Sequence, residues 1–167
     1  MTFYFIAAII VLLLVWLFFW PSGRRRTKAV PIRQLRPHLE FLLRIAKEGS
    51  FLIFQDQKSS RFVQFRKASD GKEGDFLALD FPDAPWSRCY FEGVARALKQ
   101  YGVRYAFAPT ESLEIPRFLQ VERIATVDEA QEIAELIFRE LGLEEDAKVD
   151  VVLQVTGCQP LAGSGRH

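Results

Sequence analysis

The sequence is poor in the residues that usually carry catalysis. Its 167 residues include two histidines, His38 and His167, and two cysteines, Cys89 and Cys158. General acid–base catalysis at neutral pH usually employs histidine, and neither histidine here stands in a motif with a serine, a cysteine or a second histidine. Nucleophile elbows, phosphate-binding loops and zinc-protease motifs are also missing. We therefore expect that the protein is not an enzyme and binds no cofactor.

Metal and nucleic-acid binding have equally little support in the sequence. The two cysteines are too few and too far apart for a metal framework, and a CxxC pair is absent. The 22 basic residues are balanced by 21 acidic ones, which gives a formal net charge of +1. Nucleic-acid-binding domains usually carry a marked excess of positive charge. We expect neither a metal site nor a nucleic-acid partner.

Charged residues, glycine and proline are all absent from residues 3–20, FYFIAAIIVLLLVWLFFW. As a helix this run is about 27 Å long, close to the hydrocarbon thickness of a bilayer. It predicts a single-pass transmembrane anchor over residues 1–20. A cleaved signal peptide is the alternative, but such peptides need a basic start and small residues at the cleavage site, and this run has neither.

A basic cluster after the run predicts its orientation. Lysine and arginine next to a membrane span stay on the cytoplasmic side, and aromatic rings settle at the membrane interface. We expect the N-terminus outside a bacterial-type inner (plasma) membrane and the following domain in the cytoplasm. The basic side chains also suit anionic lipid head groups. The residues expected at the interface are Trp16, Trp20, Arg24, Arg25, Arg26 and Lys28.

The remainder predicts one α+β domain, a sandwich of helices on a mostly antiparallel sheet. We expect a basic linker at residues 21–31, the domain at 32–156 and a flexible tail at 157–167. Helical spacing of apolar residues occurs at 37–47, 87–101 and 126–141. Extended alternation occurs at 51–55, 61–67, 75–81, 104–108, 117–124 and 148–155. The predicted order after the anchor is α-β-β-β-α-β-β-α-β.

The third helix is the best specified, because Thr126 and Glu129 have the spacing of a capping box. Gly142 is expected to end this helix. For the second helix, Ser87 is the expected N-cap and Gly102 the expected stop.

Three segments resemble a known family. They are residues 62–65 (FVQF), residues 76–82 (FLALDFP) and the helix at 130–143. They are similar to the YbjN-like, type III secretion chaperone-like (TY-Chap) family over roughly residues 35–143. The resemblance implies a compact α+β sandwich and chaperone-like protein binding without catalysis, often as a dimer. The membrane run and the strand at 148–155 depart from the usual design of that family.

The function expected from these observations is a membrane-anchored cytoplasmic module that binds another protein. It would act as a chaperone-like or assembly factor, through an exposed sheet face or an edge strand, and as a homodimer if the resemblance extends that far. The residues expected on this surface are Phe62, Gln64, Arg66, Phe76 and Phe118. Two alternatives remain open: an enzyme that uses a carboxylate pair such as Asp80 and Glu122, and a structural subunit of a membrane complex.

Overall fold

The computed structural model describes residues 24–26, 29–72, 74–110, 115 and 117–155. Its helices are the short 3-10 helix η1 (Ile32–Gln34), α2 (Arg36–Arg44), α3 (Arg88–Gln100) and α4 (Val127–Glu140). Its strands are β1 (Arg24–Arg26), β2 (Val30–Pro31), β3 (Phe51–Asp56), β4 (Phe62–Ser69), β5 (Asp75–Pro82), β6 (Ala106–Pro109), β7 (Arg117–Ile124) and β8 (Lys148–Gln154).

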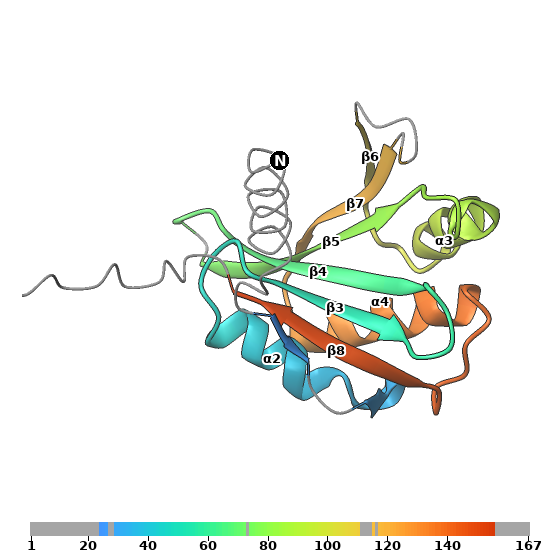
Figure 1. Ribbon diagram of the computed structural model, residues 1–167. Coiled ribbons are helices and arrows are strands. Elements are labelled where there is room, and N and C mark those ends of the chain that lie inside the picture. The colour runs from blue at the N-terminus through green and yellow to red at the C-terminus, as the bar shows by residue number, and fades with distance from the viewer. Residues whose placement is uncertain (1–23, 27–28, 73, 111–114, 116, 156–167) are drawn as a thin grey trace, which may run out of the picture.

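The strands of the described residues form one sheet in the order β1-β8-β3-β4-β5-β7-β6, with β2 also paired to β8. Every pairing between neighbours is antiparallel. The chain runs β3, β4 and β5 as a meander, and then α3 leads to the β6–β7 hairpin at the far edge (Figure 1). The last strand, β8, lies toward the other edge of the same sheet, between β1 and β3.

Alternation along the strands determines which side chains enter the core. Successive side chains of a strand point to opposite faces, and in β3 every second residue is buried. Leu52 lies opposite Phe65 and Phe54 opposite Val63, and all four side chains are buried. The same face continues through Leu77, Leu79 and Phe81 of β5, Leu119 and Val121 of β7, and Val149 and Val151 of β8.

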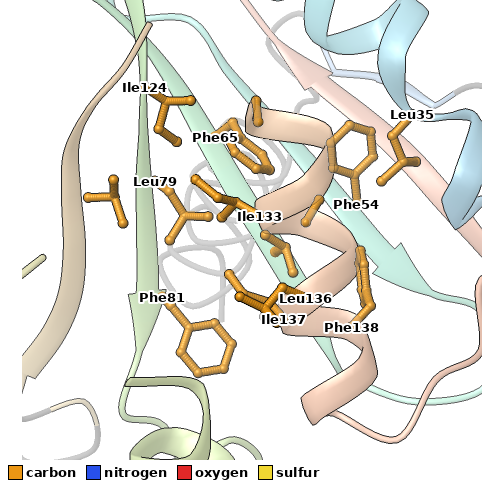
Figure 2. Close-up of a cluster of buried hydrophobic side chains, with 14 of the residues drawn as sticks. Leu35, Phe54, Phe65, Leu79, Phe81, Ile124, Ile133, Leu136, Ile137 and Phe138 are labelled. Carbon is orange, nitrogen blue, oxygen red and sulfur yellow. The ribbon is translucent and has the colours of Figure 1, made fainter. Parts of the chain in front are cut away.

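Helices α2 and α4 lie side by side on this buried face, below the sheet in Figure 1. Figure 2 shows Ile133 and Ile137 of α4 among the side chains of the central strands. Each is fully buried. Because one apolar stripe of α4 packs on several strands at once, this contact forms the centre of the core.

Helix α3 covers the same face near the β6 edge. The ring of Phe91 stacks on Phe81, with the centroids 6.1 Å apart, and lies 5.8 Å from the ring of Phe107 on β6. The guanidinium of Arg117 lies over both Phe91 and Phe107, and its Nε is 3.1 Å from Oδ2 of the buried Asp83. This arginine therefore joins α3 to the β6–β7 hairpin.

The fold class predicted from the sequence needs two corrections. It included a transmembrane helix, but no helix of the described residues is long and apolar enough to cross a membrane. Residues 3–20, where that helix was expected, lie outside the described residues. The predicted order also began with a helix, whereas β1 and β2 come first and pair with β8. The architecture that stands is an α+β sandwich with helices on one face of an antiparallel sheet.

The structure confirms the predicted side-chain N-cap of α4 and contradicts the one predicted for α3. The N–H of Glu129 donates to the Thr126 hydroxyl at 3.1 Å, and the Glu129 carboxylate accepts from the N–H of Ala125. The predicted cap of α4 is confirmed. Ser87 does precede α3, but its hydroxyl oxygen accepts from the N–H of Ala84, donates to the carbonyl of Pro82 and accepts no hydrogen bond from an N–H of the helix. The prediction that the Ser87 side chain caps α3 was therefore wrong.

A pair of phenylalanine substitutions tests which face is the core. We expect Phe65→Ala to lower the free energy of unfolding by about 3–5 kcal/mol, because it leaves a cavity beneath the helices. Phe76→Ala, on the opposite face, should cost roughly 1–2 kcal/mol, since that ring is only partly buried. Urea unfolding of both variants measures the difference. Equal losses would mean that the assignment of the two faces is wrong.

Candidate functional site

The face of the sheet opposite the helices is the candidate site, and we call it the open face. No helix of the described residues covers it, although its central side chains are partly buried by one another. It is formed by the alternate residues that do not enter the core. These are Phe51, Ile53, Phe62, Gln64, Arg66, Phe76, Ala78, Asp80, Phe118 and Gln120.

A row of polar residues crosses the middle of the open face. Gln64 of β4 lies opposite Asp80 of β5, and Asp80 lies opposite Gln120 of β7. The register continues to Ile53 on β3 and to Ala106 on β6. Because antiparallel partners directly opposite each other lie about 5 Å apart, these polar groups form one continuous strip across three strands.

Asp80 holds this strip together. Its side chain is only 13% exposed, and its Oδ1 accepts a hydrogen bond from Nε2 of Gln120 at 2.9 Å. The second carboxylate oxygen lies 3.5 Å from Nε of Arg66. Arg66 itself is 42% exposed, so part of its guanidinium faces solvent. The centre of the open face thus presents a fixed set of hydrogen-bonding groups.

Aromatic side chains lie at the end of the strip where β4 begins. The ring of Phe62 is 4.9 Å from the indole of Trp86, and the indole also contacts the buried ring of Phe81 edge-on. Phe118 of β7 lies opposite Pro82 in the same part of the sheet. This end of the open face is therefore apolar.

An arginine covers an aromatic ring at the other end. The guanidinium of Arg123 lies 4.7 Å from the centroid of Phe76, and its NH1 is 2.8 Å from Oδ2 of Asp70. Beside it is a shallow hollow of about 430 Å³, lined by Arg104, Tyr105, Ala106, Gln120, Glu122 and Arg123. The hollow extends the polar strip toward the edge strand β6.

The structure brings together the five residues that the sequence predicted for a partner surface. Phe62, Gln64, Arg66, Phe76 and Phe118 all lie on the open face, and all are partly buried. Their placement is a structural result, whereas their role in binding stays a prediction.

The residues predicted for a membrane interface fall largely outside the described part of the chain. Trp16, Trp20 and Lys28 are not among the described residues. The backbone of residues Arg24–Arg26 forms β1, which pairs with Leu153 and its neighbours in β8. Part of the segment expected as a linker is therefore an edge strand of the sheet.

The two acids of the enzyme alternative have different surroundings. Asp80 is bonded to Gln120 and Arg66, whereas Glu122 is exposed, two residues beyond Gln120, where it lines the hollow. Within the described ranges, no three His, Cys, Asp or Glu side chains are placed to hold a metal ion.

Two polar residues that contact the open face were not predicted from the sequence: Gln120, which bonds to Asp80, and Arg123, which lies over the ring of Phe76. Gln120 lies two residues after Phe118 in β7 and therefore on the same face, so the alternation of side chains along the strand could have predicted it. Arg123 could not be predicted in this way, because the pairing of β5 and β7 shifts register between Leu77 and Leu79. Such a bulge changes the direction of the side chains that follow it.

A buried ammonium group lies near the end of β4 and the start of β5, on the helix-covered side of the sheet. The Lys67 side chain is 6% exposed, and its Nζ lies 2.7 Å from Oδ2 of Asp75, which is half exposed. The hydrogen bond from Lys67 is the main cause that holds the pKa of Asp75 below its ordinary value of 3.8. The ion pair therefore stabilises the fold wherever Asp75 is ionised.

Comparison with known proteins gives no match to any family model, curated protein or solved structure. The resemblance to the YbjN-like, type III secretion chaperone-like family stays a prediction.

The Lys67–Asp75 pair makes stability depend on pH in a defined direction. Because the pKa of Asp75 is lower in the folded state than in the unfolded chain, its contribution is present above pH 3.8 and is lost as the pH falls below that value. Asp75→Asn should lower the urea midpoint at neutral pH. The difference between the midpoints of the variant and the wild type should become smaller in acid. A difference between the two urea midpoints that stays constant from neutral pH to below pH 3.8 would contradict this role of the ion pair.

Proposed function

We propose that this protein is a protein-binding module that recognises its partner through the open face of the sheet. One observation carries the proposal: α2, α3 and α4 all cover the same face, which leaves the other face of the central strands without a helix among the described residues. A sheet that is packed on one side only usually turns polar side chains to water on the other. Here the second side carries aromatic rings instead, arranged around a bonded polar strip.

The composition of the open face supports protein recognition. Aromatic residues and arginine are enriched in the energetically important parts of protein interfaces. Phe62 and Phe76 lie toward opposite ends of the strands, and Arg66 stands between them with its guanidinium partly free to bind an acceptor. The rings would supply apolar area, and the polar strip would fix the orientation of the partner.

The polar strip also favours a specific partner over non-specific apolar contact. Asp80 is only slightly exposed and already has two partners, so its charge is compensated before binding. Gln64 and Arg66 can then bond to a partner without leaving an unpaired buried charge, which would be costly. A partner that lacks matching groups would leave them unsatisfied and bind weakly.

The place of action is part of the proposal. The consecutive arginines of β1, followed by Lys28, favour the cytoplasmic surface of a bacterial-type membrane. A chaperone-like or assembly role there rests on the family resemblance alone. A second copy of the chain is one partner that fits this role.

A matched pair of glutamine substitutions tests the open face as the binding surface. Gln64→Arg places a long charged side chain at the β4 end of the polar strip, and Gln100→Arg makes the same change at an exposed position of α3. We expect Gln64→Arg to reduce the amount of co-purifying partner at least tenfold, which corresponds to about 1.4 kcal/mol, while Gln100→Arg leaves it unchanged.

The measurement is quantitative affinity capture of the tagged full chain from detergent extracts, with thermal unfolding to confirm that both variants fold. Recovery of a second, differently tagged copy would identify a homodimer. Equal recovery from both variants would show that the open face is not the binding surface.

A further inference from the structure

The outer edge of β6 carries backbone groups that the sheet does not use. β6 is the last strand of the sheet, and among the described residues no strand pairs with it on the side away from β7 (Figure 1). The N–H of Asp83, which follows β5, donates to the carbonyl of Arg117 at 2.9 Å, so the backbone of Arg117 points toward β5. Because successive residues of a strand direct their backbone groups to opposite sides, those of Phe118 and Gln120 point toward β6.

This alternation determines which backbone groups of β6 point outward. Ala108 lies opposite Phe118 and Ala106 opposite Gln120, so both alanines direct their N–H and carbonyl to β7. The N–H and carbonyl of Phe107 therefore point away from the sheet. In the part of the chain that the structure describes, no backbone group pairs with them. At Phe107 the edge thus presents one donor and one acceptor in the geometry that an added strand requires.

The two faces of this edge differ in their side chains. On the helix-covered face, the ring of Phe107 is 44% exposed, although it contacts the rings of Phe91 and Tyr105. On the open face lies Ala106, a small residue that lines the hollow of about 430 Å³. Since an extended segment alternates its side chains between faces, one of its residues would cover the Phe107 ring and the next would enter the hollow.

The charges of the hollow indicate which side chain would enter it. Arg104 and Glu122, which both line the hollow, are exposed and have opposite charges. The third charged residue of the lining, Arg123, already forms an ion pair with Asp70 at 2.8 Å. An uncharged amide side chain both donates and accepts hydrogen bonds. Such a side chain therefore fits this mixed lining better than a charged one does.

We propose that the outer edge of β6 binds an extended segment of a partner protein, which adds to the sheet as a further strand. Its backbone would bond to the N–H and carbonyl of Phe107. An apolar side chain of the segment would cover the Phe107 ring, and a neighbouring uncharged polar side chain would enter the hollow. The inference rests on the proposed function and states which part of a protein partner would meet this edge.

A second copy of the chain fits the edge less well. If two β6 strands paired around Phe107, Ala108 of each copy would lie opposite Ala106 of the other. Two small side chains would then meet beside the hollow and leave it unfilled. Pro109 would lie opposite Tyr105 and could not donate to its carbonyl, because proline has no N–H. A different sequence can supply both the missing N–H and a side chain long enough to fill the hollow.

Peptide selection on the full chain provides a probe for the edge. The protein, in detergent micelles, is exposed to a phage-displayed library of random linear peptides. We expect the enriched peptides to share an apolar residue next to an uncharged polar one. The backbone amide of Phe107 should exchange its hydrogen several-fold more slowly when a selected peptide is bound, whereas the amide of Gln100 on α3 should not change.

Two substitutions at position 107 separate the backbone contact from the side chain. Phe107→Val and Phe107→Pro both remove the ring and leave side chains with the same number of carbon atoms, but only valine keeps the N–H. Because this N–H points away from β7, proline should leave the pairing of β6 with β7 intact. We expect Phe107→Pro to bind a selected peptide about tenfold more weakly than Phe107→Val. Thermal unfolding checks that both variants fold, and the exchange measurement on the wild type depends on neither.

Three results would overturn the proposal: no enriched peptide, equal affinity of the two folded variants, or unchanged exchange at Phe107 with a selected peptide bound. So would slow exchange at Phe107 without any peptide that becomes slower with protein concentration, because a second copy would then occupy the edge. Gln64→Arg, which tests the open face, should leave the binding of these peptides unchanged. The edge and the open face can therefore fail separately.

Discussion

The packing of α4 against the sheet is the contact on which the rest of the structure depends. Its apolar stripe, with Ile133 and Ile137 at its centre, lies across several strands at once. Because strand side chains alternate between faces, this contact decides which half of each strand beneath α4 is buried. A shift of one residue in any strand would exchange core and surface. Leu79 and Phe65 are fixed inward by it, and Asp80 and Gln64 are fixed outward by the same register.

This constraint gives the molecule two different sides. One side consists of helices whose inner faces are used in the core and whose outer faces are exposed, including the Phe41–Ile45 pair of α2. The other side is the sheet itself, with the bonded strip of Gln64, Asp80 and Gln120. The proposed protein contact lies on the sheet side.

Much of this arrangement follows from local sequence patterns. The alternation in β3 to β5 and the capping box of α4 depend on neighbouring residues, so those elements were placed correctly, as was the shared face of Phe62, Gln64 and Phe76. The pairing of Arg24–Arg26 with β8 could not be foreseen, since three arginines carry no strand signal and the partner lies far along the chain. The Phe62–Trp86 contact and the position of Arg123 likewise depend on tertiary packing and on a bulge.

Site-specific photo-crosslinking tests the central claim, that the open face is the surface a partner occupies. A benzoylphenylalanine at position 64 reports any protein that lies against the polar strip, and the same residue at position 100 of α3 serves as the control. The account predicts a covalent adduct of one reproducible mass from position 64 and none from position 100, in cells that make the full chain. Adducts from position 100 alone, or from neither position, would contradict it.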